Sequence, residues 1–276
     1  MKSSWRFSSP FLLWLPLLGI GLPGQVAPSF DFVTNNEFTG AEIKSLALIK
    51  SAIASPTPLI ASVPKTGTDP IASPYPIPWG WVEKAQSEVT RSGRAEVRSY
   101  QSEQMVSPDG EYTAYSQIRM RVEPQFTASQ ISSALVIKHR PTGQIQQIEL
   151  PTRLLRNSAR PSDLTGTIAI LWPVGWSQTG DRLLIRNFVA LTSSDIASDS
   201  AVVWYRQSKR TATICPQSVD YDTAVLMGWS ATHPNQLLFR TSLLGDSQEQ
   251  LWAVNEQGQT IAAPGDRPLI YGQRVP

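Results

Sequence analysis

The chain has 276 residues, enough for one large domain or two small ones, and its 17% charged residues and 22 prolines argue against a coiled coil or a mainly helical protein. The 24 basic and 22 acidic residues give a net charge of +2, and removal of a segment containing Lys2 and Arg6 would leave 22 of each sign. The longest basic run is only Lys209-Arg210. Because a nucleic-acid partner requires a clustered basic face, we expect no nucleic acid.

The first 27 residues have the layout of a secretory signal. Lys2 and Arg6 give a basic start, and residues 11–22 form a short apolar run that Pro16 interrupts. The run is shorter than the roughly 20 residues that a membrane-spanning helix needs. The sequence therefore predicts a periplasmic or otherwise exported protein. An uncleaved, membrane-attached N-terminus is the alternative, and it would be the chain's only membrane contact.

Residues 28–55 contain a predicted helix, and residues 56–80 form a predicted linker. Thr39 and Glu42 fit a capping box, and residues 41–54 place apolar side chains on one helical face. Proline occurs seven times between residues 56 and 78, a density that forbids helix and central strand. At the end of the linker, Trp79 and Trp81 are predicted to pin the chain onto a core; an exposed binding platform is the alternative.

A strand–turn–strand pattern recurs through residues 81–276. It is clearest at Gly175-Trp176-Ser177, returns at Gly228-Trp229-Ser230, and has a looser copy at Val106-Ser107-Pro108-Asp109-Gly110. Proline and glycine supply the backbone angles of a tight turn, and apolar alternation predicts strands on either side. We expect strands at 94–105, 111–120, 132–138 and 144–150, then at 168–172, 183–189, 201–205 and 211–215, then at 224–227, 236–240, 250–254 and 259–263, with a short one at 268–271.

The repeat resembles that of TolB-type β-propeller proteins, in which an apolar or aromatic residue precedes Ser-Pro-Asp-Gly. The first copy keeps this pattern, whereas the copies at Trp176 and Trp229 keep the aromatic residue and the serine but lose the Pro-Asp pair. The resemblance covers about residues 95–263. It implies an all-β, propeller-like array of three to four antiparallel β-meander blades, and proteins with this repeat are mostly periplasmic or extracellular binding and assembly factors. The whole chain also resembles uncharacterised proteins of cyanobacteria.

Closure of the array is left open by the sequence. Closed propellers have at least four blades, and three are visible. Residues 79–103 joined with the C-terminal tail would supply a fourth; otherwise the array is open, or two sheets form a sandwich-like body. Insertions at residues 153–165 and 191–200 are the expected binding loops.

The sequence predicts no catalytic, cofactor or metal site. His139 and His233 read as turn histidines, since two histidines and the distant Cys215 do not make a zinc site. Cys215 reads as a small buried strand residue. The loop carboxylate pairs Asp195/Asp199 and Asp220/Asp222 lack the glycine typical of calcium loops, so Asx-turns are expected there.

A nucleophile elbow at Ser177 or Ser230 is disfavoured, because a nucleophile has no reason to recur in every repeat. The serine is expected to bond the turn backbone, and Trp176 and Trp229 to fill equivalent buried positions. The expected function is a non-enzymatic binding or scaffolding module of the cell envelope whose partner is another protein. The alternative is a glycan- or peptide-acting hydrolase, with tryptophans as sugar platforms and loop carboxylates as acid and base.

Overall fold

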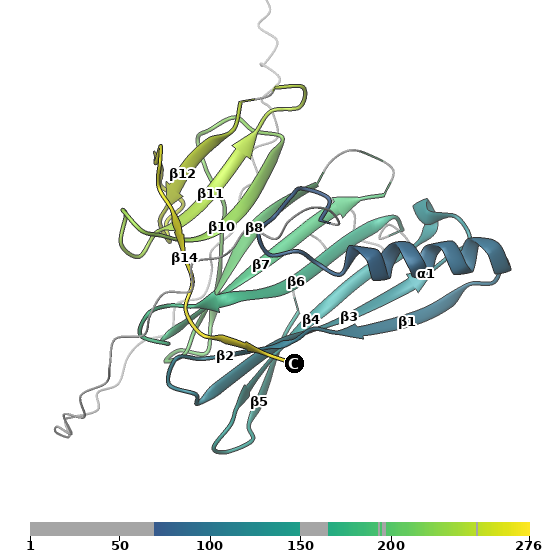
Figure 1. Ribbon diagram of the computed structural model, residues 1–276, viewed down its shortest axis with the longest axis horizontal. Helices are drawn as coiled ribbons and strands as arrows, with labels where there is room; N and C mark the ends of the chain where they lie inside the picture. Colours follow the sequence, from purple (N-terminus) through teal and green to yellow (C-terminus); the bar gives the residue numbers. More distant parts are fainter. Residues whose placement is uncertain (1–68, 150–164, 193, 195–196, 247) are drawn as a thin grey trace, which may run out of the picture. The chain divides into compact units, whose positions relative to one another are not determined.

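The computed structural model describes residues 69–149, 165–192, 194, 197–246 and 248–276 (Figure 1). All of them belong to one compact unit, Ile53–Pro276. The predicted signal segment, the predicted helix at 41–54, most of the linker and nearly all of the 153–165 insertion lie outside the described residues. Within the described ranges, no helix has the length and apolarity needed to cross a membrane.

The described chain is mainly β, which confirms the all-β prediction at this level. Its α-helix is α1 (Trp79–Ser92), and η1 (Phe126–Ala128) is a short 3-10 turn. The strands are β1 (Glu96–Gln101), β2 (Gln104–Val106), β3 (Tyr112–Val122), β4 (Gln130–His139), β5 (Ile145–Ile148), β6 (Thr167–Trp176), β7 (Arg182–Leu191), β8 (Ala197–Tyr205), β9 (Thr211–Ile214), β10 (Thr223–Ser230), β11 (Leu237–Ser242), β12 (Gln250–Val254), β13 (Thr260–Ala262), β14 (Pro268–Leu269) and β15 (Gln273–Val275).

The strands form three antiparallel meanders of four, as predicted: β2 to β5, β6 to β9, and β10 to β13. The first two meanders do not stand apart as blades. They share one curled ten-stranded sheet, because β4 and β6 pair in parallel at Ile131 and Ile168. The third meander forms a separate flat sheet of five strands with β14 (Figure 1).

Helix α1 was not predicted, and it occupies the residues proposed for part of a fourth blade. Val82, Ala85 and Val89 recur at helical spacing and are buried, while Gly93 ends the helix in the left-handed conformation at φ 67°. The proline-rich segment therefore ends at Pro78, and the expectation of a blade built from residues 79–103 is wrong.

The tryptophans at the start of α1 pin the chain to the core. Trp79 meets Phe126 edge-on with ring centroids 6.4 Å apart, and Trp81 meets Tyr100 at 5.5 Å. Both rings are partly buried against the main hydrophobic core. This confirms the anchoring interpretation over an exposed platform.

The predicted strand at 94–105 is two strands, because the chain breaks its direction at Ser102. The Ser102 N–H donates to the Ser116 carbonyl at 2.9 Å, and the Ser102 hydroxyl accepts the Ser116 N–H at 2.9 Å. These bonds replace the regular ladder at this point. As a result, β1 pairs with the C-terminal part of β3 and β2 with its N-terminal part.

The buried apolar side chains of the described residues form three clusters, two of them large. The larger core joins α1, both sheets and the segment before α1. The smaller core lies within the ten-stranded sheet and contains Trp176, Trp204 and Tyr112. Trp176 is 0% and Trp229 7% exposed, and they pair across their turns with the equivalent residues Leu183 and Leu237. The predicted equivalence of the two tryptophans is confirmed.

A buried arginine links the segment before α1 to both sheets. The side chain of Arg186 in β7 is 0% exposed and pairs with Asp69 at 2.6 Å and with Asp199 of β8 at 2.7 Å. Asp69 also accepts the N–H groups of Ile71, Ser73 and Ile77. Asp199 accepts the Leu226 N–H of β10 at 3.0 Å. The two carboxylates therefore hold both the arginine and the backbone of the segment before α1 and of β10.

The position of Asp199 corrects the prediction for the second insertion. Residues 191–200 were expected to be a binding loop, but Leu191 ends β7 and Ala197 begins β8. Burial raises the pKa of Asp199 to about 6, against the opposing influence of Arg186, so the carboxylate is ionised at neutral pH.

The C-terminal tail crosses all three meanders. Leu269 pairs with Trp229, Tyr271 with Trp176, and Gln273 with Val106. Tail residues two positions apart thus meet the residue before the serine in the third, second and first repeats. The tail therefore reaches the first meander by pairing with β2, without the fourth blade that residues 79–103 were suggested to form with it.

Glycine makes this crossing sterically feasible. A methyl group on Gly175 would lie 3.2 Å from the Tyr271 carbonyl oxygen, and one on Gly228 3.1 Å from that of Leu269. In the first repeat the glycine is on the tail instead: a methyl on Gly272 would lie 2.5 Å from the Val106 carbonyl oxygen. The glycine of each Gly-Trp-Ser sequence therefore lies where the tail backbone approaches too closely for a side chain.

Replacing Trp176 by alanine is expected to cost about 3–5 kcal/mol of unfolding free energy, because it empties a fully buried site. Denaturant unfolding measures this loss. Trp252→Ala is the matched control, since Trp252 is only partly buried and its loss should be smaller. Equal losses would contradict the assignment of Trp176 as the core anchor.

Replacing Arg186 by leucine is expected to lower the unfolding free energy by about 3–5 kcal/mol, because two buried carboxylates lose their partner. Arg121→Leu is the control: Arg121 also pairs with a carboxylate, Glu123 at 2.9 Å, but its side chain is 69% exposed, so about 0–1 kcal/mol is expected. A loss below 1 kcal/mol for Arg186→Leu would overturn the role of the network.

Candidate binding site at the turn face

The turns that follow β2, β6 and β10 share one construction around the repeated serine. In each turn the serine hydroxyl donates to a carboxylate oxygen 2.5 Å away: Ser107 to Asp109, Ser177 to Asp181, and Ser230 to Asp266. The same hydroxyl accepts a backbone N–H, from Tyr112, Arg182 and His233 respectively. We call these three units the Ser–Asp brackets. The predicted bonding of the serine to its turn is confirmed.

Each bracket obtains its aspartate from a different place. Asp109 lies two residues after its serine and Asp181 four residues after. The third turn has no aspartate of its own and takes Asp266 from the residues just before β14. Each turn also contains one residue in the left-handed conformation, although the residue type differs: Gly110 (φ 73°), Gly180 (φ 71°) and Asn235 (φ 65°).

Hydrogen bonding to the serines lowers the pKa of all three bracket carboxyls. Partial burial alone would raise the pKa values of Asp109, Asp181 and Asp266. The hydroxyl donors outweigh that effect, with further help from Arg206 at Asp109, Thr179 at Asp181 and backbone N–H groups at Asp266. The brackets are therefore ionised structural elements at neutral pH.

Ser230, His233 and Asp266 lie close together but do not form a catalytic relay. A triad requires histidine between serine and acid, with one ring nitrogen toward each. Here the Ser230 hydroxyl donates directly to Asp266, and the same Nδ1 atom of His233 lies 3.4 Å from both. The serine is 5% exposed. This geometry leaves no free nucleophile.

Charged side chains connect successive turns. Arg206, which follows β8, pairs with Asp109 and Glu111 in the first turn, and its guanidinium lies 4.7 Å from the Tyr112 ring centroid. Glu256, at the equivalent position after β12, lies 3.6 Å from Arg182 in the second turn. Arg206 and Glu256 therefore occupy the same position of the repeat but carry opposite charges. They keep neighbouring turns at a fixed spacing.

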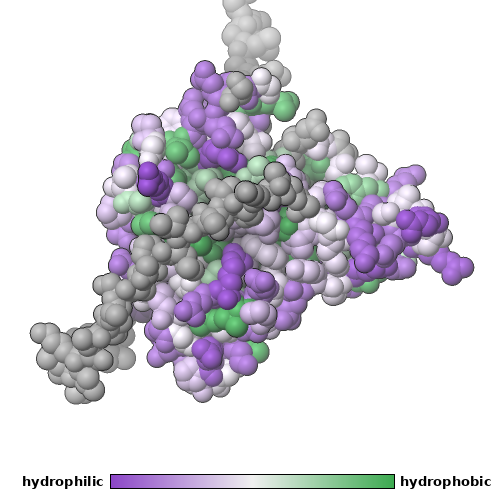
Figure 2. Space-filling model, in the orientation of Figure 1, coloured by the Kyte–Doolittle hydropathy of each residue, from purple (hydrophilic) through white to green (hydrophobic). Residues whose placement is uncertain are grey.

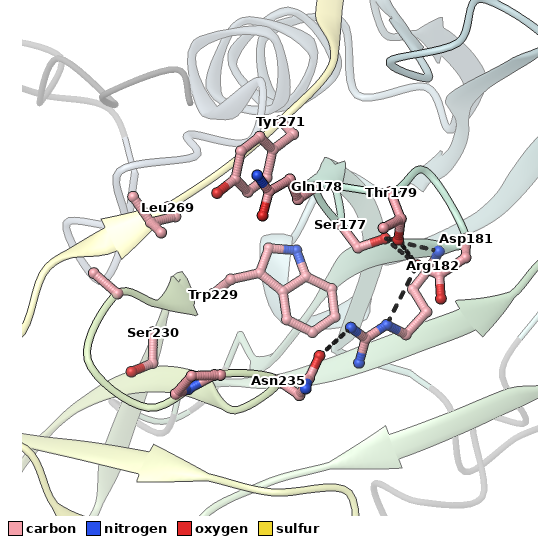
Figure 3. Close-up of a pocket in the computed structure, with 12 residues that line it drawn as sticks. Ser177, Gln178, Thr179, Asp181, Arg182, Trp229, Ser230, Asn235, Leu269 and Tyr271 are labelled. Atoms are coloured by element: carbon pink, nitrogen blue, oxygen red, sulfur yellow. Dashed lines mark hydrogen bonds and ion pairs between the residues drawn. The ribbon is translucent and has the colours of Figure 1, made fainter. Parts of the chain in front are cut away.

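A pocket of about 410 Å³ opens between the second and third turns and the tail (Figure 3). It is lined by Ser177, Gln178, Thr179, Asp181, Arg182, Trp229, Ser230, Ala231, Pro234, Asn235, Leu269 and Tyr271. The Arg182 guanidinium lies 4.8 Å from the Trp229 ring centroid and donates to Asn235 Oδ1 at 2.6 Å. The pocket, the three turns and tail residues 268–275 together are called the turn face below.

Two hydrogen-bond donors in this pocket have no partner. They are the indole Nε1–H of Trp229 and the Nε–H of Arg182, both on buried atoms. The ion-pair partner of the latter, Asp181 Oδ1, is 3.7 Å away, beyond hydrogen-bond distance. Buried donors are usually satisfied, so these two point to a ligand that accepts hydrogen bonds.

The residues singled out in the sequence lie elsewhere. His139 ends β4 against Tyr112, with Nδ1 2.7 Å from the Thr142 hydroxyl. Cys215 follows β9 half-buried, and burial raises the pKa of its thiol. Asp222 accepts the Leu244 N–H at 2.7 Å, a bond between residues 22 positions apart and not the local Asx-turn that was expected. Asp195 is outside the described residues. Among those described, no group of three or more His, Cys, Asp or Glu side chains is placed to hold a metal.

Sequence reasoning named Trp229 and the turn residues but did not foresee the pocket. The pocket depends on Leu269 and Tyr271 from the tail, and nothing in the local pattern reveals which turns the tail approaches. Glycine before each tryptophan was the available signal. A scan against protein-family models finds no match for this chain, and a search of curated proteins finds no similar sequence.

Asp181→Asn tests the ionised bracket through pH. Because the folded-state pKa of Asp181 is lowered, its charge contributes stability above the unfolded pKa of about 3.9, and this contribution is lost as pH falls through the folded value. We therefore expect the stability difference between wild type and Asp181→Asn to be constant above about pH 5 and to shrink below about pH 4. Denaturant unfolding from pH 7 to pH 3 measures it, and a difference independent of pH would contradict the assignment.

Proposed function

We propose that this protein is a non-enzymatic binding or scaffolding module of the cell envelope, and that it holds another protein at the turn face. The observation that carries the proposal is the pocket beside Trp229, where two buried donors lack partners. The N-terminal layout of basic residues and a short apolar run supports the envelope location.

The rigidity of the turn face supports a recognition role. The Ser–Asp brackets, the inter-turn ion pairs and the tail fix the position of each turn before any partner arrives. Such pre-organisation lowers the entropic cost of binding. On the face drawn in Figure 2, hydrophobic side chains appear in small separate groups among polar ones. This distribution favours recognition by hydrogen bonds over docking of a broad apolar patch.

We further propose that the three meanders are a merged, propeller-like array related to the TolB-type repeat. Equivalent tryptophans, equivalent brackets and a tail that meets one position in every repeat support a common repeated ancestor. In this proposal the tail takes the place of a closing blade.

The hydrolase alternative has no specific support at its candidate residues. Asp199 is buried beneath Arg186 and does not line the pocket at the turn face, and the two repeat tryptophans are buried instead of offering sugar platforms. The hydroxyls of Ser177 and Ser230 donate hydrogen bonds to carboxylates.

Site-specific photo-crosslinking tests the binding role. A photo-reactive phenylalanine derivative replaces Gln178, an exposed pocket residue, in intact cells of the source organism before the envelope is fractionated. We expect a discrete protein adduct in the envelope fraction, because position 178 lies at the contact surface.

The matched control carries the same photo-reactive residue in place of Lys84, which is exposed on α1 and lines none of the pockets described above. It should give no such adduct. Adducts of equal yield at both positions, no adduct at position 178, or recovery of the protein in the cytoplasmic fraction would overturn the proposal.

A further inference from the structure

The indole of Trp229 lacks the hydrogen-bond partner that three other tryptophans of the fold have. Trp176 Nε1 donates to the Met105 carbonyl at 3.4 Å, Trp204 Nε1 to Gln146 at 3.0 Å, and Trp252 Nε1 to Thr241 at 2.9 Å. Trp229 is 7% exposed, and its nitrogen has no partner. In Figure 3 this nitrogen points into the space bounded by Ser177, Gln178 and Tyr271. A buried donor in that position selects for an acceptor atom.

The charge around the pocket disfavours an anionic acceptor. Arg182 is the cation of the pocket wall, and it already faces two carboxylates, Asp181 at 3.7 Å and Glu256 at 3.6 Å. One positive charge between two negative charges leaves no net attraction for a third carboxylate or a phosphate. The acceptor that fits is therefore uncharged.

The aromatic surfaces of the pocket disfavour a sugar. Sugar recognition commonly uses an open aromatic face, but the guanidinium of Arg182 covers one face of Trp229 at 4.8 Å from its centroid. Tyr271 is 8% exposed. The groups that remain for contact are hydrogen-bonding ones, including the amides of Gln178 and Asn235, which match the polar groups of a peptide.

We infer that this pocket binds an uncharged amide carbonyl of a peptide segment, whose oxygen accepts from Trp229 Nε1–H. The inference rests on the proposed protein-binding function and names its chemistry. Because this donor atom is buried, the carbonyl reaches it from the side of the pocket lined by the exposed side chain of Gln178. That side chain makes no hydrogen bond that would hold it there, so its displacement is inexpensive.

Titration of the ¹⁵N-labelled full-length protein tests the inference through the tryptophan indole N–H resonances. The probe is the capped neutral dipeptide acetyl-Gln-Ala-amide, and sodium acetate and cellobiose are the anionic and glycan comparisons. Trp229→Phe identifies the Trp229 resonance. We expect the dipeptide to shift that resonance and to leave Trp176 unmoved, because Trp176 Nε1 already has a partner.

Trp229→Phe also removes the donor while keeping an aromatic ring, and it should weaken dipeptide binding by about tenfold. A shift of Trp229 by acetate alone or cellobiose alone, equal shifts of Trp176 and Trp229, or no shift with any probe would each overturn the inference. If the resonance does not respond to the dipeptide while crosslinks at position 178 persist, the carbonyl inference fails and the binding function stands.

Discussion

The contact on which the described structure depends is the fully buried guanidinium of Arg186 between Asp69 and Asp199. A buried ion pair adds little net stability against well-packed apolar side chains, since desolvation offsets most of the attraction. The contribution of this ion pair is instead to fix the positions of the chain segments that it joins. The planar guanidinium of β7 and the carboxylate of β8 bond each other, and the network also bonds the backbone of two further segments, the chain before α1 and β10. The two sheets are thus docked by geometry as well as by the core.

Local pattern predicted most of the β structure because apolar alternation and turn residues act within a few positions of each other. The limits of β12 match the prediction at both ends, and most other strands differ by a few residues; the strand predicted at 94–105 is split into β1 and β2, and β15 was not predicted. The pattern did not reveal α1, whose buried stripe of Val82, Ala85 and Val89 follows a glycine and two tryptophans that resemble the end of a linker. It also could not separate a blade from half of a merged sheet, since that depends on one parallel bridge between Ile131 and Ile168.

The candidate site could likewise be predicted only in part from the sequence. Recurrence of serine after an aromatic residue was enough to reject a nucleophile and to assign a structural hydroxyl. The carboxylate that completes the third bracket, Asp266, is 36 positions from its serine and could not be paired from spacing. Arg186 reads as one basic residue in an apolar strand, and its partners lie 117 and 13 positions away. Polar contacts between residues so far apart in the sequence are the part of the site that could not be predicted.

The tail also dictates an order of events during folding. Gln273 pairs with Val106 across 167 positions of sequence, so β15 completes a strand pair with the first meander only after the chain between them has been made. Until the tail has docked, one edge of β2 is unpaired, the tail does not yet cover Gly175 and Gly228, and the third bracket lacks Asp266. Contacts of such long sequence separation slow folding. The described fold therefore stays incomplete until residues 266–275 have docked.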